Sequence, residues 1–200
     1  SVHDAAALPV AASTAVQAID DHAGIKPGQR VLINGAAGGV GTMAVQVAVA
    51  RGAEVVGVCS AKNVELIRRL GAADVIDYTT TDVTDLHERF DLIVDTGGRA
   101  PLRKLRRILT ERGTYVIVGA ETGGRFTGGI GRNLRAVLLS MFVSQRLTFF
   151  ISSESRTSID PLVGLLAAGD VVPAIGRRAA LAETADAIRA IGSGSGSGKT

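Results

Sequence analysis

The sequence predicts a doubly wound α/β fold, in which helices cover both faces of a six-stranded parallel sheet. Short apolar runs rich in β-branched residues alternate along the chain with segments at helical spacing. These runs are continuously apolar, as in parallel strands that are buried on both faces. One run, at residues 30–35, leads through a glycine-rich turn into a long apolar helical segment. Repeated β-α-β units of this kind build a three-layer αβα domain.

Length and composition indicate one folded domain. The chain has 200 residues, of which 46% are hydrophobic and 20% are charged, enough for a sizeable core. A net charge of +3 is too small to indicate nucleic acid but suits a small polyanion. The single cysteine, Cys59, excludes an internal disulfide and fits a reducing cytosol. No apolar run is long enough to span a membrane, so we expect a cytoplasmic protein without membrane or nucleic-acid partners.

The N-terminal part is predicted to be helical. Residues 4–23 have helical character, with a break or a restart at Pro9, because proline is tolerated only in the first turn of a helix. Ser13 and Thr14 either cap the second segment or contact a ligand, and capping or packing is the simpler interpretation. Residues 24–28 contain glycine and proline and are expected to form a turn.

Strands and helices then follow in regular order. Gly52 and Gly71 are expected to end two of the helices, because glycine readily adopts the left-handed conformation there. Strands are expected at residues 30–35, 54–59, 74–77, 90–95, 113–118 and 146–152. Helices are expected at residues 40–51, 62–70, 82–88, 101–110, 133–144, 158–168 and 182–191. The remaining stretches are a glycine-rich loop at 119–131, an extended stretch at 171–176 and a flexible, linker-like tail at 192–200.

The glycine-rich turn after the first strand predicts a phosphate-binding site. Gly38 and Gly41 occupy the second and third positions of the G-x-G-x-x-G pattern, while Ala36 stands at the first. We therefore expect Gly35 to make the tight turn. Glycines let a phosphate approach main-chain N–H groups, and the first turn of the next helix favours negative charge. The expected ligand is the pyrophosphate of a dinucleotide, and the alternative is a purely structural turn.

The residues after the second strand indicate which dinucleotide is bound. An Asp or Glu there would bond the ribose 2′-hydroxyl and repel a 2′-phosphate, but Glu54 lies at the other end of the strand. Ser60 and Lys62 stand there instead, and a hydroxyl with an ammonium suits a phosphate monoester. We predict NADPH rather than NADH; the simpler interpretation is a capping serine and a solvated lysine. Tyr78 either lies beside the adenosine end or is an ordinary surface residue.

The other motifs in the sequence give weaker indications of function. The C-terminal Gly-Ser-Gly-Lys-Thr resembles a P-loop, but that pattern requires glycine where Ser193 stands, so we expect no nucleoside triphosphate site. The basic run at residues 103–107 lies on a segment with an apolar stripe and is expected to be a surface helix rather than a nucleic-acid patch. The isolated histidines have no metal-ligand spacing, and we expect no metal site. Cys59 is expected to be a buried strand residue rather than a nucleophile.

Together these motifs resemble the medium-chain dehydrogenase/reductase superfamily, and most closely its zinc-free quinone oxidoreductase branch. The matching pieces run in order from about residue 4 to residue 191 and include Ala6-Ala7-Leu8-Pro9, the turn from Gly35 to Gly41, Leu70-Gly71-Ala72 and Val75-Ile76-Asp77-Tyr78. The resemblance implies an NAD(P)-binding Rossmann domain over residues 1–191. It also implies a reductase that transfers hydride from NADPH to a quinone or to an activated C=C or C=O substrate.

The resemblance also implies a set of cofactor-binding residues. It places Ala37, Gly39 and Val40 on the pyrophosphate, Ser60 and Lys62 on the 2′-phosphate with Tyr78 beside it, and Thr14 near the nicotinamide. Gly38 of the glycine pattern is also expected to bind the cofactor. Thr96 and Gly119 complete the expected set. The loop that begins at Asp95 is one residue shorter than is usual in the family. Because the cofactor supplies the hydride, no acid–base pair is required of this sequence, and the catalytic residues are not assigned.

Family members normally begin with a GroES-like catalytic domain, and nothing in this chain resembles one. We therefore expect an excised nucleotide-binding domain that is poorly active or inactive alone. Family members also commonly dimerise through the edge of this domain, so the strand at 146–152 is the expected seam of a homodimer.

Two other functions remain open: a non-catalytic dinucleotide sensor, or a domain of a zinc-type alcohol dehydrogenase. A short-chain reductase is less favoured, because neither Tyr78 nor Tyr115 is followed by lysine four residues later.

Overall fold

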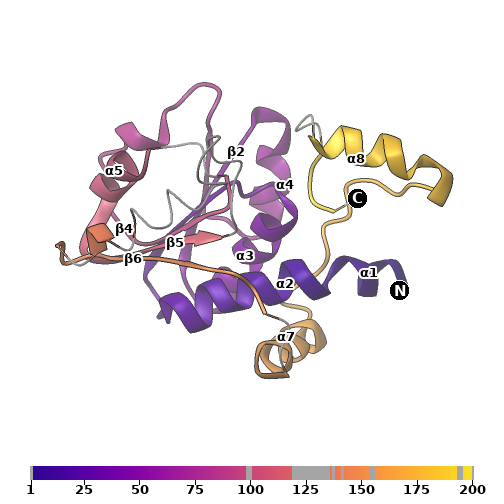
Figure 1. The fold of residues 1–200 in the computed structure, drawn as a ribbon, viewed down its shortest axis with the longest axis horizontal. Helices are drawn as coiled ribbons and strands as arrows, with labels where there is room; N and C mark the ends of the chain where they lie inside the picture. Colours follow the sequence, from indigo (N-terminus) through magenta and orange to yellow (C-terminus); the bar gives the residue numbers. More distant parts are fainter. Residues whose placement is uncertain are drawn as a thin grey trace.

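In the computed structural model, whose fold is drawn in Figure 1, six parallel strands form one sheet. Their order is β3-β2-β1-β4-β5-β6. The structure describes residues 2–97, 101–118, 136, 138–140, 142–153, 156–192 and 196–199. The strands are β1 (Arg30–Asn34), β2 (Glu54–Cys59), β3 (Asp74–Asp77), β4 (Phe90–Asp95), β5 (Leu109–Val118) and β6 (Arg146–Phe150). The strand order reverses between β1 and β4, as in a doubly wound fold. The predicted fold class is confirmed.

Helices cover both faces of this sheet. The α-helices are α1 (Val2–Ala7), α2 (Pro9–Val16), α3 (Gly39–Ala50), α4 (Val64–Arg69), α5 (Leu102–Leu105), α7 (Arg156–Ala168) and α8 (Thr184–Gly192). A π-helical segment, η1 (Gln17–Ala23), continues α2, and short 3-10 turns are η2 (Ala61–Asn63), η3 (Val83–Asp85), η4 (Arg106–Ile108) and η5 (Leu181–Glu183). Helix α2 packs against both α3 and α7 (Figure 1). Among the described residues, no helix combines the length and apolar character needed to cross a bilayer.

The core consists of two apolar layers, one on each face of the sheet. Val31 and Ile33 of β1 belong to the layer under α2 and α3, whereas Leu32 belongs to the layer that includes Leu105 of α5. Successive strand residues point to opposite faces, so a strand covered on both sides must be apolar at every position. This is why the central strands β1, β2 and β4 are largely apolar, whereas the edge strands β3 and β6 are less buried and carry polar residues.

The predicted strands at 54–59, 74–77 and 90–95 agree residue for residue with the structure, but the segment from 101 to 110 differs. It was expected to be helical throughout, whereas the helical part ends at Ile108 and β5 begins at Leu109. Leu109 pairs with Phe90, and an irregularity in register separates this pair from the rest of the β4–β5 ladder. Both side chains are buried, so this tertiary contact overrides the local helical spacing.

Other differences concern short elements. The helix expected at 82–88 is the single 3-10 turn η3, and 171–176 contains only an isolated bridge from Ile175 to Lys199. Ser13 and Thr14 do not cap a helix, because they lie inside α2, whose N-cap is Leu8. The loop expected at 119–131 lies outside the described residues. Five residues of the helix expected at 133–144 also lie outside them; residues 136 and 138–140 are helical, whereas 142–144 form a turn and bends rather than the expected helix end.

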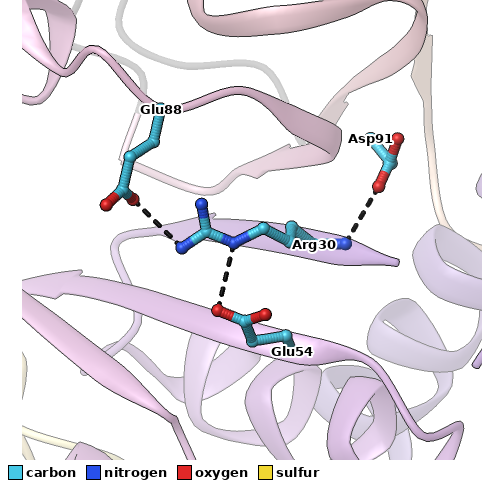
Figure 2. Close-up of polar contacts among 4 residues, drawn as sticks. All are labelled: Arg30, Glu54, Glu88 and Asp91. Atoms are coloured by element: carbon cyan, nitrogen blue, oxygen red, sulfur yellow. Dashed lines mark hydrogen bonds and ion pairs between the residues drawn. The ribbon is translucent and has the colours of Figure 1, made fainter. Parts of the chain in front are cut away.

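Arg30 joins three segments at the amino ends of the strands (Figure 2). Its Nε donates to Glu54 Oε1 at 3.1 Å, its Nη2 donates to Glu88 Oε2 at 3.0 Å, and its backbone N–H donates to Asp91 Oδ2 at 3.0 Å. Its guanidinium carbon also lies 5.4 Å from the centroid of the Phe90 ring. One guanidinium group therefore holds β1, β2 and the segment that enters β4.

Candidate functional site

The glycine-rich turn lies at the carboxyl end of β1, next to the end of β4, where the strand order reverses. Gly35 has a φ of +82°, and a Cβ added there would lie 2.5 Å from Thr96 Oγ1. A Cβ on Gly41 would lie 2.1 Å from the carbonyl oxygen of Gly35. Gly35 therefore makes the tight turn, as expected, and Gly41 lets α3 pack closely on the strand. Ala36 has no positive φ.

The first turn of α3 presents backbone donors. Gly38 is the extended N-cap, and Thr42 donates the first helical hydrogen bond, to the Gly38 carbonyl at 2.9 Å. The N–H groups of Gly39, Val40 and Gly41 precede that bond, so they are the donors that a helix offers to an external acceptor. The positive end of the helix dipole adds to the preference for an anion.

A cation from the other end of the sequence lies over the same turn. The N–H of Gly198 donates to the carbonyl oxygen of Ala37 at 2.8 Å. A Cβ added to Gly39 would lie 3.0 Å from Lys199 Cε and 3.3 Å from Lys199 Nζ. A cation at the positive end of a helix dipole is unfavourable on its own. An anion bound between the Lys199 ammonium and the N-terminus of α3 would be attracted by both. Lys199 and the turn therefore form an anion-binding arrangement.

Helix α3 itself positions the segment that holds Lys199. The Gln46 side chain donates from Nε2 to the Val172 carbonyl at 3.0 Å and accepts at Oε1 from the Val172 N–H at 2.9 Å. Two residues further along, the Ala174 carbonyl accepts from the Lys199 N–H at 2.8 Å. Gly198 has a φ of +61°, and a Cβ there would lie 2.1 Å from the Ala174 carbonyl oxygen, so this approach requires glycine.

This arrangement differs from the flexible tail predicted for residues 192–200, over the part that the structure describes. Gly198 and Lys199 form backbone hydrogen bonds with Ala37 and with the 174–177 segment. Sequence reasoning set the Gly-Ser-Gly-Lys-Thr motif aside as a false P-loop and missed Lys199. The available signal was a lone lysine in a Gly/Ser-rich stretch, which by itself does not identify its partner.

The three residues predicted for the 2′-phosphate lie near one another. Ser60 is the N-cap of η2, and its Oγ accepts from Asn63 Nδ2 at 3.2 Å. The Tyr78 N–H donates to the carbonyl of Cys59, the residue before Ser60, at 3.1 Å, and the Tyr78 side chain is exposed. Lys62 lines a cavity of about 310 Å³ that extends to residues 174–176 and Ser197.

One carboxylate and one thiol border this region. Asp77 accepts from the Thr79 N–H at 2.9 Å and from the Thr79 hydroxyl at 2.8 Å, and these bonds hold the pKa of Asp77 below its usual value. Burial, and secondarily the charge of Asp77, raises the pKa of Cys59 to about 11. Cys59 is a buried strand residue, as predicted, and its thiol stays protonated near neutral pH.

The remaining predicted residues have different surroundings. Thr96 follows β4 and donates from Oγ1 to the Asn34 carbonyl at 2.9 Å, so it lies at the glycine turn. Thr14 is buried in α2 and donates from Oγ1 to the Val10 carbonyl at 2.5 Å. Gly119 lies outside the described residues. The structure therefore brings Thr96 to the turn, while the Thr14 hydroxyl bonds its own helix.

A buried network that sequence reasoning missed supports this edge of the sheet. Asp95 accepts from Asn34 Nδ2 at 2.8 Å, from the Gly97 N–H at 3.2 Å and from the Tyr115 hydroxyl. Asp95 is 1% exposed, so its carboxylate depends on these donors. The network ties β1, β4 and β5 together beside the turn. Within the described residues, no group of three or more His, Cys, Asp or Glu side chains is placed to hold a metal ion.

Comparisons with known proteins identify the family to which this chain belongs. Residues 70–200 match the family described as zinc-binding dehydrogenase. The chain is 36% identical to the mitochondrial NAD(P)H oxidoreductase RTN4IP1 of Mus musculus, over 98% of this chain and 54% of that protein. It is 29% identical to the chloroplast envelope quinone oxidoreductase homolog of Arabidopsis thaliana, over 92% of this chain and 56% of that protein.

A solved structure shows the same similarity. The quinone oxidoreductase from Coxiella burnetii aligns with a TM-score of 0.80 and 28% identity, over 97% of this chain and 58% of that one. The chain thus spans about half the length of the relatives it matches. It belongs to the zinc-binding dehydrogenase family, as a quinone oxidoreductase-like member of the medium-chain dehydrogenase/reductase superfamily.

Proposed function

We propose that this chain is the NADPH-binding domain of an oxidoreductase that transfers hydride to a quinone or to an activated C=C or C=O substrate. The observation that carries the proposal is the placement of Lys199 over the N-terminus of α3. That helix end already favours an anion, and the side chain of Lys199 approaches Gly39 where any Cβ would crowd it. The mouse relative's name, NAD(P)H oxidoreductase, supports a nicotinamide cofactor, and the Arabidopsis relative's name, quinone oxidoreductase homolog, supports the substrate class.

The turn has the features required to bind a pyrophosphate. The N–H groups of Gly39, Val40 and Gly41 are available as donors, and Gly38 and Gly39 lack side chains that would keep a phosphate away. Lys199 would neutralise part of the negative charge. Thr96 and the Asp95 network would hold the turn in place, since both contact β1 where it enters the turn.

NADPH is favoured over NADH by the groups at the end of β2. The Ser60 hydroxyl and the Lys62 ammonium would bind the 2′-phosphate, with Tyr78 beside them. Asp77 is a nearby carboxylate, and its Oδ1 accepts both the backbone N–H and the hydroxyl of Thr79. We therefore infer that Asp77 shapes its own turn rather than binding a ribose hydroxyl.

The bound cofactor would supply the hydride, and the protein would bind and orient it. Because the chain spans about half the length of its relatives, we infer that substrate contacts and catalytic groups come from elsewhere in the whole protein. The isolated chain is expected to bind cofactor and to turn over poorly.

Nucleotide titration tests the proposal. The chain should bind NADPH more tightly than NADH when the binding is followed by nucleotide fluorescence. The double variant Ser60→Ala, Lys62→Gln should lose about tenfold in NADPH affinity, with a smaller loss for NADH. Equal losses for the two nucleotides would contradict the 2′-phosphate assignment. The absence of saturable binding to either nucleotide would contradict the function itself.

We also propose a homodimer through the edge of the sheet. β6 pairs with β5 on one side only within the described sheet, and the exposed side chains of Phe142 and Ile151 flank it. An edge strand presents unpaired backbone groups that a second copy can bind. Sedimentation of the chain should show a dimer that Phe142→Ser weakens, and a monomer at all concentrations would exclude this seam.

A cytoplasmic location is likewise a proposal, supported by one buried thiol and no second cysteine. The mouse relative is named as mitochondrial. Fractionation of cells that express the whole protein would decide between the two compartments.

A further inference from the structure

A cavity lined by arginines lies at the amino ends of β4 and β5, at the opposite edge of the sheet from the glycine turn. Its volume is about 550 Å³ and it opens to solvent. Its lining includes Arg89, Arg106, Arg107, Thr110, Glu111 and Gln145, and we call it the arginine cavity. β4 runs from Phe90 beside this cavity to Asp95 beside the glycine turn, so the length of a strand separates the two sites.

Arg106 is held in place but has an unused donor. Its Nη1 donates to Gln145 Oε1 at 3.2 Å, and Gln145 Nε2 donates to the carbonyls of Arg106 and Thr110 at 3.2 and 3.1 Å. Arg106 Nε is buried and has no hydrogen-bond partner among the described residues. Leaving a buried donor without an acceptor is costly, and a charged donor more so.

The charge of the cavity is not neutralised internally. Within the part of the chain that the structure describes, no carboxylate lies at ion-pairing distance from Arg89, Arg106 or Arg107. Glu88, next to Arg89 in sequence, is paired with Arg30 instead (Figure 2). The lining therefore contains three guanidinium groups and one carboxylate, that of Glu111.

Two contacts within the cavity fix its shape. Arg89 donates from Nη1 to the carbonyl oxygen of Arg107, which joins the segment before β4 to η4. The Ser144 hydroxyl donates to the Glu111 carbonyl at 2.7 Å, which holds the turn before β6 against β5. The cavity is therefore built from four chain segments that are bonded to one another around the arginines.

We propose that the arginine cavity binds the phosphoryl group of a small organic phosphate. Guanidinium groups bind phosphate oxygens through paired N–H donors, and three of them suit a dianion. The volume exceeds what a bare phosphate needs and falls within the range of small-molecule sites. The Glu111 carboxylate would accept a hydrogen bond from a hydroxyl on the organic part. This ligand is separate from the dinucleotide, which would bind at the other edge of the sheet.

Calorimetric titration of the 200-residue chain with glycerol 3-phosphate tests this proposal, with glycerol as the control for the organic part. We expect saturable binding of glycerol 3-phosphate and none of glycerol. Arg106→Gln and Arg107→Gln should each weaken the binding at least about tenfold. Arg107 is exposed and has no side-chain hydrogen bond among the described residues, so its variant tests the site even where Arg106→Gln disturbs the fold.

Two matched variants distinguish binding in the arginine cavity from diffuse attraction and from binding at the glycine turn. Arg103→Gln removes one charge from the same basic run without touching the cavity, and it should leave the binding unchanged. A loss equal to that of Arg107→Gln would mean diffuse attraction and would overturn the proposal. Lys199→Gln should also leave it unchanged; a loss confined to Lys199→Gln would place the phosphate at the glycine turn and would overturn the proposal too. NADPH binding by the Arg107→Gln variant should match that of the parent chain.

Discussion

The N–H of Gly198 donates a 2.8 Å hydrogen bond to the carbonyl oxygen of Ala37. This bond connects the last described segment of the chain to the glycine-rich turn after β1. This bond places Lys199 at the N-terminus of α3. The anion site therefore has contributions from two ends of the sequence. Its backbone donors are local to the turn, whereas its cation depends on tertiary structure.

Gly198→Ala should lower nucleotide affinity with little effect on the melting temperature. A Cβ there would lie 2.1 Å from the Ala174 carbonyl at a φ of +61°, so the segment would have to move and would carry Lys199 away from the turn. Gly196→Ala is the matched control, because nothing lies within 4 Å of its added Cβ. NADPH titrations of both variants measure the effect. Equal affinities would show that the segment does not contribute.

Lys199→Gln should have opposite effects on binding and on stability. It should weaken NADPH by about tenfold, because a charge-assisted contact is lost. Without nucleotide it should raise the free energy of unfolding by about 0.3–1 kcal/mol, because a cation no longer faces the positive end of α3. Lys26→Gln, at an exposed turn, should change neither quantity. Urea denaturation with and without NADPH measures both, and lower stability of the unliganded Lys199→Gln variant would contradict this prediction.

Gly41→Ala should destabilise the domain on the order of 1–3 kcal/mol, because its Cβ would meet the Gly35 carbonyl oxygen at 2.1 Å and push α3 from the strand. Gly164→Ala, inside α7, should have the opposite sign. Nothing lies within 4 Å of its added Cβ, so it should gain about 0.5–1 kcal/mol from helix propensity. Chemical denaturation of the two variants provides the test, and similar changes in both would contradict it.

The Cys59 thiol should react slowly in the folded chain. Its pKa is raised to about 11 by burial, so thiolate is scarce near neutral pH and access is blocked. The folded state keeps the thiol proton to higher pH than the unfolded state, so this contribution to stability is present below about pH 9 and is lost as the pH rises towards 11. A thiol-reactive dye measures the rate, with denatured chain as the control. Equal rates would contradict the burial.

Arg30→Gln should cost about 1 kcal/mol of stability, since the guanidinium joins Glu54 and Glu88 and lies over Phe90. Part of this difference should disappear at high salt, where exposed ion pairs are screened. Arg189→Gln is the control. Among the described residues Arg189 pairs only with Asp186, and both side chains are exposed on helix α8. The control should change stability by less than about 0.5 kcal/mol. An equal loss in both variants would mean that the Arg30 cluster has no special role.

Much of the fold could be predicted from the sequence because its signals are local. The strand at 54–59 is a largely apolar run after the helix-ending Gly52, the strand at 74–77 follows the helix-ending Gly71, and both have the predicted bounds. Leu109 shows where local sequence signals fail to predict the structure. It lies at helical spacing from Leu105, so a local pattern extends the helix, whereas the strand there arises from pairing with Phe90.

The candidate site likewise has residues that local sequence signals predict and residues that only the packed fold brings together. The glycine turn, Ser60 and Lys62 follow strands that the sequence identifies, so their proximity was predictable from the carboxyl-edge rule for parallel sheets. Lys199, the Asp95–Tyr115 contact and the arginine cavity bring together residues far apart in the chain. No periodicity in one sequence encodes such contacts, and they appear only once the helices and strands are packed.

The pairing of Gln46 with the backbone of Val172 makes position 172 tolerant of sequence drift. The Gln46 amide bonds the backbone N–H and carbonyl of Val172, whose own side chain is 52% exposed. Almost any side chain at position 172 would therefore preserve this contact. Gly176 is different, because a Cβ there would lie 1.9 Å from the Ser197 carbonyl oxygen. In a set of diverged homologues, glutamine at 46 and glycine at 176 should persist while position 172 varies freely.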